Sequence, residues 1–410
     1  MEPTGKPLLS ATPERLVSLD AYRGFVMLAM VSGGLGLARL AQAEGFKENP
    51  FWRGLGYQFD HVAWTGCAFW DLIQPSFMFM VGVALAYSAA ARKGQGQSYL
   101  QMLVHAAWRA IVLILVGVFL RSNGSLTEEK SPYINWMFTD VTSQIGMGYL
   151  FLFLLWGWPR WVQATAAGLV LFGYWLLFAL WPLPAAGFDF ASVGVPPEWE
   201  HLTGFGAHWD KNTNPAAAFD VWFMNLFPRP KPFVFEGGGY QTLNFIPSLA
   251  TMIFGLLAGE LLRSNHSGRR KFWTLVAAGC SGLIAGLILH YTNLCPIVKR
   301  IWTPSWAIYS TGWTCLMLSV FYAVIDLGNL KKLAFPLAIV GMNSVAIYCL
   351  NYLIRGWILI TLQRYLGTEW YTFGGWLNPA YKPLWESLAA LLVLWLIMLW
   401  MYRRKVFLRI

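Results

Sequence analysis

The chain has 410 residues, of which 57% are hydrophobic and only 12% are charged. Soluble domains carry about 25% charged residues, so these charges are too few to coat one large soluble core. The net charge of +10 comes from basic residues in short loops between apolar runs, whereas a nucleic-acid-binding protein would gather them in one patch. These features exclude a soluble domain and a nucleic-acid partner, and they indicate a protein surrounded by the lipid bilayer.

Ten apolar runs are long enough, or nearly so, to cross a bilayer, which takes roughly 20 residues in a helix. The fourth run is short and the ninth is long. The runs are continuous, without the alternation of a membrane β-barrel. The sequence therefore predicts an all-α polytopic membrane protein with about ten transmembrane helices, near 18–41, 68–91, 103–121, 141–157, 162–181, 243–262, 272–291, 305–326, 334–362 and 384–402.

Lysine and arginine are unevenly distributed between the two sides of these predicted helices. One side holds the two termini and the even-numbered loops, with fifteen such residues in about sixty, and the other side holds eleven in about 145. Cytoplasmic loops are the ones enriched in Lys and Arg. Both termini are therefore predicted to face the cytoplasm.

The largest loop on the opposite side spans about 182–242 and is rich in Trp, Asn, Pro and Gly. Loops of this length are usually functional or disordered, and the aromatic residues argue against disorder. Trp209, Trp222 and Glu236 are candidates to contact a substrate there. No internal repeat or cytoplasmic domain is evident, so 1–410 is predicted to form a single transmembrane domain with this extracytoplasmic loop.

The densest group of polar residues opens the second apolar run, with Asp60, His61 and Trp64 followed by Asp71. The His61 imidazole titrates near neutrality, so it could act as a general base or take an acyl group as a nucleophile. Asp60 or Asp71 could orient its ring, and Trp64 could contact substrate. The structural alternative is an interfacial histidine beside a helix start, with Asp71 as a buried polar anchor.

A second group, Asp20 and Arg23, opens the first run on the predicted cytoplasmic side. Asp20 could cap the helix, and Arg23 could extend to lipid headgroups. The functional alternative is that Arg23 binds a phosphate of a cytoplasmic cofactor. Both interpretations stay open.

Further polar side chains lie within the runs or at their ends, namely Gln144, Lys299, Asn343 and Ser344. They could line a cofactor channel, bind an anionic group, or simply connect helices and anchor them at the interface. Gly255 and Gly259, four residues apart, predict a close helix contact.

Signatures of several other enzyme classes are absent. The sequence has no Walker A loop, no G-x-S-x-G, no H-E-x-x-H and no C-x-x-C, so ATP-driven transport and a zinc site lack support and no metal is expected. Cys67 and Cys295 both fall near predicted outer helix ends, where they could form a disulfide.

Several motifs, in order, resemble the transmembrane acyltransferase family typified by heparan-α-glucosaminide N-acetyltransferase. The run S-L-D-A-Y-R-G at 18–24 is similar to the family's start, and His61, Trp64, Gly66, Asp71, Leu72, Pro75, Phe77, Phe79 and Gly82 keep the spacing of its H-x-x-W-x-G, D-L and P-x-F-x-F-x-x-G segments. Further matches are Gln144 with Tyr149, the run 246–262, Pro296 with Lys299 and Trp302, the run 341–344, and the tail 402–405. The resemblance covers nearly the whole chain.

The resemblance implies an activity and a site. Family members take acetyl-CoA from the cytoplasmic side and deliver the acetyl group to a sugar amine on the far side. His61 matches the family's catalytic histidine, proposed as base or transient acetyl carrier. A multi-pass protein of the bacterial inner membrane is implied, without the animal enzyme's luminal amino-terminal domain, and a homodimer would fit the family.

The sequence departs from the family at three places. Thr65 stands where the animal enzyme has Asn, the region of Gly34 lacks its catalytic-site Asn, and Ile145 replaces an Arg. These departures leave the acceptor, and the acyl donor, open. The leading hypothesis is acetyl transfer from acetyl-CoA to an extracytoplasmic sugar. The alternatives are a transporter or flippase for a glycolipid or small solute, and a structural or sensing protein.

Overall fold

The computed structural model describes residues 16–123 and 132–408. These residues form fourteen α-helices and an isolated bridge between Thr65 and Val298, with no β-strand among them. The helices are α1 (Val17–Val31), α2 (Leu37–Ala41), α3 (Pro50–Gln58), α4 (Ile73–Gly94), α5 (Tyr99–Asn123), α6 (Val141–Leu155), α7 (Arg160–Ala179), α8 (Pro215–Met224), α9 (Phe245–Arg263), α10 (Gly268–Tyr291), α11 (Pro304–Phe321), α12 (Phe335–Met342), α13 (Ser344–Leu366) and α14 (Lys382–Arg403).

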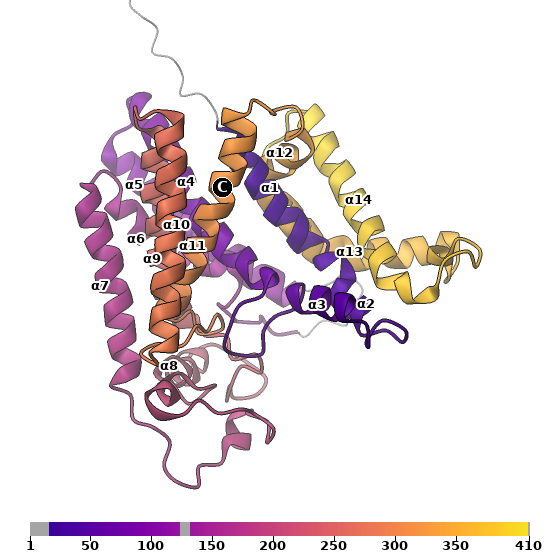
Figure 1. Ribbon diagram of the computed structural model, residues 1–410, viewed down its shortest axis with the longest axis horizontal. Helices are drawn as coiled ribbons and strands as arrows, with labels where there is room; N and C mark the ends of the chain where they lie inside the picture. Colours follow the sequence, from indigo (N-terminus) through magenta and orange to yellow (C-terminus); the bar gives the residue numbers. More distant parts are fainter. Residues whose placement is uncertain (1–15, 124–131, 409–410) are drawn as a thin grey trace, which may run out of the picture.

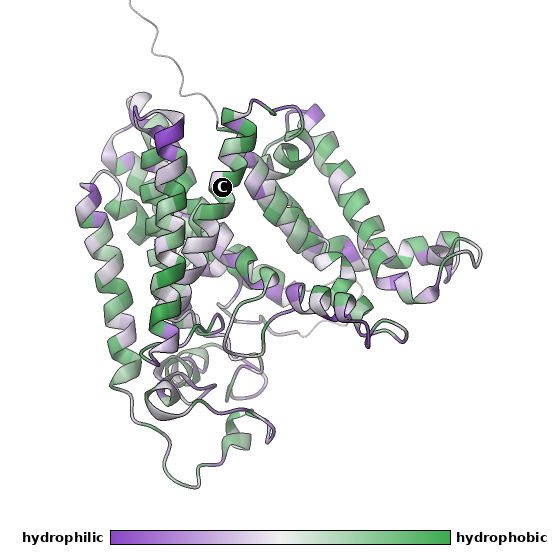
Figure 2. Cartoon of the chain, viewed as in Figure 1, coloured by the Kyte–Doolittle hydropathy of each residue, from purple (hydrophilic) through white to green (hydrophobic). Residues whose placement is uncertain are grey.

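The all-α polytopic architecture predicted from hydropathy is confirmed. Within the described ranges, eight helices are long and apolar enough to cross a membrane, and a ninth follows if α1 is joined to the segment Gly34–Ala41 across a 48° bend. The fourth predicted span corresponds to α6, which is apolar but has only 15 residues. Every predicted run coincides with helix, but the number ten stays a prediction. Figure 2 shows hydrophobic residues along the long helices and hydrophilic ones gathered near their ends.

The first predicted span is broken after Val31. The backbone takes positive φ angles at Gly33, Gly34 and Gly36, a conformation that glycine adopts at little cost. The Arg355 guanidinium from α13 donates to the Val31 carbonyl at 2.8 Å and so caps the open end of α1. The bend turns α2 and α3 across the end of the bundle (Figure 1).

The ninth predicted span, expected as one long helix over 334–362, is two helices, and that expectation is wrong. Asn343 separates α12 from α13 with φ −123° and ψ 36°, outside the helical region. Its side-chain amide donates to the Val406 carbonyl at 3.1 Å and accepts from the Leu408 amide at 3.1 Å. The break therefore ties the C-terminal tail to the bundle.

Glycines allow the central helices to approach closely. A Cβ atom at Gly255 would lie 1.9 Å from the Phe79 carbonyl oxygen, and one at Gly259 would lie 2.8 Å from that of Val83. In α4, a Cβ at Gly82 would meet the Met252 carbonyl oxygen at 1.9 Å. The helix contact predicted from Gly255 and Gly259 is confirmed, with α4 as the partner of α9.

The two ends of the described chain lie at one end of the bundle, and the segment between α7 and α9 lies at the other (Figure 1). This segment, the large loop predicted at about 182–242, contains α8 and short 3-10 turns. Of the basic residues that predict the orientation, Lys6, Arg15, Lys130 and Arg409 lie outside the described residues. We call the end formed by 182–242 the loop end, and the opposite one the terminal end.

Candidate functional site

The segment between α3 and α4 positions His61 at the loop end. It pairs with the loop between α10 and α11, through the bridge of Thr65 with Val298 and a 2.9 Å hydrogen bond from the Gly66 amide to the Ile297 carbonyl. This pairing brings Lys299 next to a histidine 238 residues earlier in the chain. The backbone contact therefore assembles the side chains of the site.

His61, Asp71 and Lys299 form one compact cluster. The His61 Nδ1 atom lies 2.7 Å from Asp71 Oδ1, and Lys299 Nζ lies 3.3 Å from the same oxygen. The other Asp71 oxygen accepts from the backbone amides of Ala68 at 3.1 Å and Val62 at 3.3 Å. Because Asp71 is only 1% exposed, these four donors are what stabilise its buried carboxylate.

The arrangement selects one tautomer of His61. A carboxylate only accepts hydrogen bonds, so His61 donates through Nδ1–H and keeps the lone pair on Nε2. Lys299 Nζ is also 3.1 Å from Nδ1, but neither atom can then accept, so this proximity reflects the carboxylate that they share. Nε2 is the atom left to act as a base or a nucleophile.

Burial lowers the pKa of His61 below its ordinary value of 6.5. The hydrogen bond to Asp71 opposes this shift, and the nearby positive charge of Lys299 adds to it. The imidazole is therefore neutral at pH 7, which is the form that a general base requires.

His61 lies in the wall between two cavities. The first, which we call the outer cavity, has a volume of about 730 Å³ and is lined by α2, α3 and the His61 loop, including Lys47, Arg53 and Asp60. The second, the inner cavity, has a volume of about 290 Å³ and includes Lys299 and Tyr240. A group on His61 can thus meet reactants that arrive from different sides.

A third cavity of about 240 Å³, the deep cavity, lies further toward the terminal end. Arg23, Arg109 and Ser344 line it, and Val141 lines both the deep and the inner cavity. The wall between them includes the 2.8 Å hydrogen bond from the Tyr348 hydroxyl to Asp140. The two cavities together form an interrupted passage from Arg23 to His61.

The remaining predicted cofactor residues lie elsewhere. The Gln144 amide donates to the carbonyls of Phe138 at 2.9 Å and Thr242 at 3.1 Å, and Asn343 holds the C-terminal tail. Asp20 is buried in α1, where its backbone carbonyl faces Gly341 of α12. The structure thus brings Arg23 and Ser344 together at the deep cavity and Lys299 to the inner one.

The aromatic residues predicted for substrate binding differ in exposure. Trp209 is fully buried, and its ring stacks on Phe178 with an interplanar angle of 8°. Trp64 is also buried and donates from its indole nitrogen to the Trp209 carbonyl at 3.0 Å. Trp222 is 60% exposed on α8. Of the three, only Trp222 presents a ring to the surroundings.

Two acidic residues predicted for the site, Glu236 and Asp60, accept hydrogen bonds from backbone amides. Glu236 accepts from the Tyr240 amide at 2.8 Å and so helps to hold a residue that lines the inner cavity. The Asp60 carboxylate accepts from the His61 amide at 2.8 Å and also lines the outer cavity. Asp71, not Asp60, therefore contacts the imidazole.

Several residues of the passage were not among the sequence candidates. Arg109 lies in the middle of the third predicted span, where a charge at membrane depth is itself a functional signal. Asp140 caps α6 through a 2.9 Å bond from the Thr142 amide, a role that Asp directly before an apolar run could have indicated. Tyr348 and Tyr240 lack any comparable local signal.

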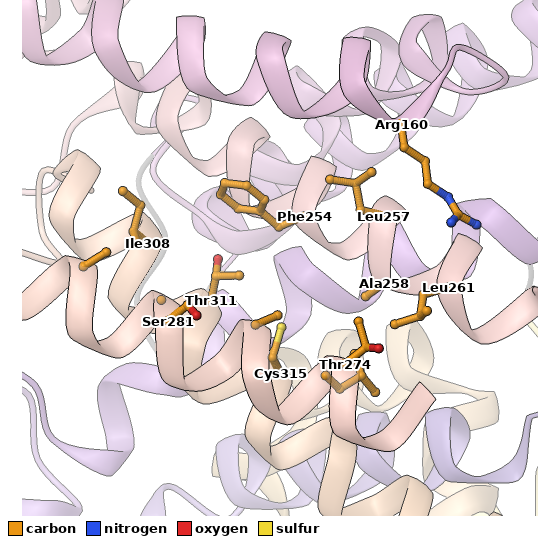
Figure 3. Close-up of a pocket in the computed structure, with 14 residues that line it drawn as sticks. Arg160, Phe254, Leu257, Ala258, Leu261, Thr274, Ser281, Ile308, Thr311 and Cys315 are labelled. Carbon is orange, nitrogen blue, oxygen red and sulfur yellow. The ribbon is translucent and has the colours of Figure 1, made fainter. Parts of the chain in front are cut away.

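A further cavity of about 560 Å³ lies away from this cluster, between α9, α10 and α11 (Figure 3). Its lining is mostly aliphatic, and Arg160 stands at one end, 3.5 Å from Glu260. All five cysteines are free thiols, so the disulfide considered for Cys67 and Cys295 is absent. In the described part of the chain, no cluster of three or more His, Cys, Asp or Glu side chains could hold a metal ion.

Comparison with known proteins gives two relatives that bear the same name. The chain is 23% identical to heparan-alpha-glucosaminide N-acetyltransferase of Homo sapiens across 98% of its own length, and 22% identical to the Mus musculus protein across 82%. It spans 61% and 53% of the length of those relatives. No protein-family model matches the chain. The extent of both similarities agrees with the ordered motifs, and it supports the resemblance to the family typified by heparan-α-glucosaminide N-acetyltransferase.

Proposed function

We propose that this protein is a membrane acyltransferase that moves an acetyl group from cytoplasmic acetyl-CoA to an amine or hydroxyl of a sugar on the opposite side. The observation that carries the proposal is the position of His61, whose neutral imidazole stands between two cavities. This arrangement suits a transfer enzyme, because a donor from one cavity and an acceptor from the other can meet at the same base. The two acetyltransferase relatives support the same chemistry.

The deep cavity fits the donor. Arg23 and Arg109 supply positive charge suited to phosphate groups, and Met27, Phe77 and Leu113 supply an apolar lining suited to a flexible thioester arm. Acetyl-CoA, when bound, would supply the thioester carbonyl that accepts the nucleophile. The passage past Val141 would direct that carbonyl toward His61.

His61 Nε2 would take the proton from the acceptor amine or hydroxyl as the acceptor oxygen or nitrogen attacks. Asp71 holds the ring in the required tautomer and stabilises the imidazolium that forms. The proton would then pass to the departing thiolate sulfur, which returns His61 to its neutral form. If His61 instead carries the acetyl group, Nε2 would bond to the carbonyl carbon as the C–S bond breaks and the thiolate leaves, and the acceptor would then attack the same carbon and release the imidazole.

Charge that develops on the carbonyl oxygen needs nearby donors. Lys299 and Tyr240 line the inner cavity beside His61, so they are the candidates. The side-chain amide nitrogens of Gln144 and Asn343 already donate to backbone carbonyls. Lys299 would therefore act at the reacting group and not only on a phosphate.

The membrane orientation belongs to this proposal. The lysine and arginine distribution predicts cytoplasmic termini, and the described ends of the chain lie together at the terminal end (Figure 1). Arg23 would then face the cytoplasm and His61 the far side. We further propose the bacterial inner membrane as the location and a homodimer as the assembly, both from the family resemblance.

A transporter or flippase would use the same passage without chemistry. The cluster of His61, Asp71 and Lys299 favours the enzyme, because a fixed tautomer and a buried ion pair serve proton transfer more directly than passage of a solute. Thioester consumption separates the two functions.

The test is acetyl transfer by the purified protein in detergent. Acetyl-CoA and glucosamine are supplied together, thiol release is followed optically, and the product is weighed by mass spectrometry. We expect product with the native protein and none above background with His61→Ala. If the native protein releases no thiol and forms no product with any amino sugar offered, the proposed function is wrong.

A further inference from the structure

An apolar groove opens on the side of the bundle next to the His61 loop. It has a volume of about 650 Å³ and lies between α1, the segment that precedes α4, and α11, with Phe25, Trp313 and Val320 in its lining; we call it the lateral groove. Along α11 its lining extends from Tyr309 to Phe321, about 18 Å at 1.5 Å per residue. Val320 is 58% exposed, so the groove is accessible from the surrounding lipid.

The lateral groove ends at the catalytic loop. Cys67 and Ala68 line it, and the Ala68 amide is one of the donors to Asp71. Gln58 also lines it and accepts from the Phe69 amide at 3.0 Å. Only a thin wall therefore separates the groove from the buried carboxylate that orients His61.

The same wall forms one side of the outer cavity. Tyr57 and Asp60, which line the outer cavity, flank Gln58 in the chain, and the rings of Phe59 and Phe69 meet at 5.5 Å between centroids. The outer cavity is far more polar than the groove and contains the cations Lys47 and Arg53. An apolar and a basic compartment thus adjoin at His61.

Helix α3, which lines the outer cavity, carries aromatic residues suited to a membrane–water interface. Phe51 is 67% exposed and Tyr57 is 55% exposed, and α3 lies across the end of the bundle in Figure 1. The basic compartment would then lie at headgroup depth and the lateral groove at hydrocarbon depth. An amphiphilic molecule with a charged head and a hydrocarbon tail has the same order of polar and apolar parts.

We infer that the acceptor is a lipid-linked sugar with a phosphate between sugar and lipid. Its hydrocarbon would lie in the lateral groove, its phosphate would bind Lys47 and Arg53, and its amine or hydroxyl would reach His61. A free sugar would use the outer cavity alone and leave the groove without a role. The inference rests on the proposed function and names its substrate class.

The experiment compares two acceptors in two tryptophan variants, and it adds a third acceptor, hexadecyl glucosaminide, to test a double variant of the cations. The acceptors are glucosamine and a hexadecyl glucosaminyl phosphate with a free amine, each supplied with acetyl-CoA to the protein in detergent. Val320→Trp fills the lateral groove. Val104→Trp is the matched control, since Val104 is 61% exposed on α5 and lines none of the cavities described.

We expect the lipid-linked acceptor to have the lower KM, and Val320→Trp to raise that KM about tenfold or more while Val104→Trp leaves it unchanged. The rate with glucosamine should be equal in both variants. The double variant Lys47→Gln with Arg53→Gln should raise the KM for the phosphate-bearing acceptor but not for hexadecyl glucosaminide, which lacks the phosphate.

The outcomes separate this inference from the proposed function. If glucosamine and the lipid-linked acceptor have equal KM values, and the two tryptophan variants do not differ, the inference of a lipid-linked acceptor is overturned. The proposed acetyltransferase function would still stand. If Val320→Trp raises the KM for the phosphate-bearing acceptor but the double variant Lys47→Gln with Arg53→Gln does not, the proposed binding of a phosphate by Lys47 and Arg53 is overturned. No transfer to any of the three acceptors would overturn the proposed function and this inference together.

Discussion

Two histidine–aspartate pairs lie at the loop end of this protein, and only one of them forms a site. In the first, His61 Nδ1 is 2.7 Å from Asp71; in the second, His201 Nδ1 is 2.5 Å from Asp210. The histidine side chains are similarly exposed, at 35% and 38%. By hydrogen-bond geometry alone the two pairs are equivalent.

Their surroundings differ. Asp210 also accepts from the Trp199 indole at 3.0 Å and the Lys211 amide at 2.8 Å, so it ties the loop segment together. The His201 ring lies 4.2 Å from Phe190. Of the described residues that line the five cavities, none belongs to this pair, whereas His61 lines two. A fixed imidazole becomes a candidate catalyst only where reactants can approach it.

The largest expected effect is the loss of the His61 imidazole. His61→Ala should lower kcat/KM for acetyl transfer by about 10²- to 10⁴-fold, the range expected for a general base. His201→Ala, measured in the same thiol-release assay, should stay near the native rate. Equal losses in the two variants would break the distinction between the pairs.

Asp71→Asn should have the next largest effect. An amide can donate to Nδ1 and so stabilise the wrong tautomer, and we expect a loss of about 10- to 100-fold, as when the carboxylate partner of a functional histidine is removed. The matched variant Asp210→Asn should leave kcat unchanged. A native rate in Asp71→Asn would assign this carboxylate a purely structural role.

Lys299→Met removes the positive charge that lies beside the pair of His61 and Asp71. The native protein should lose activity only as the pH falls below 6.5, because the pKa of His61 is lowered by burial and by the positive charge of Lys299. Removing that charge raises the pKa, so the acidic limb of the kcat/KM profile should move to higher pH. A limb that stays in place would show that Lys299 does not act on His61.

The smallest effect is expected at the second pair. His201→Ala removes one partly exposed hydrogen bond, so the free energy of unfolding should fall by about 1 kcal/mol. Thermal unfolding in detergent measures this change, and the acetyl-transfer rate of the same variant is measured beside it. A large loss of transfer activity without loss of stability would reverse the roles assigned to the two pairs.

Much of the fold was predictable, because lipid selects for continuous apolar runs and each run coincides with helix. The breaks were not. Asn343 interrupts an apolar stretch in order to bind the C-terminal tail, a contact that no local pattern reveals. Helix α6 stays short because Asp140 caps it and a bend follows at Trp156.

The site was only partly predictable. His61 and Asp71 fall in one motif, so their proximity follows from a short chain segment. Lys299 was expected near a cofactor, but its place beside His61 depends on the pairing of Thr65 with Val298, which sequence spacing does not reveal. The burial of Trp209 was not predictable, since the sequence shows an aromatic ring but not what covers it.

The hydrogen bond between Tyr348 and Asp140 has an electrical consequence in the proposed orientation. The deep and inner cavities on either side would admit water and ions, so most of a transmembrane voltage would fall across the few side chains around this bond. A unit charge that crosses 100 mV changes in energy by about 2.3 kcal/mol. Arg121, whose Nε atom is 4.0 Å from Asp140, carries its charge within this focused field. The insulating layer of the protein would then be thinner than the bilayer around it.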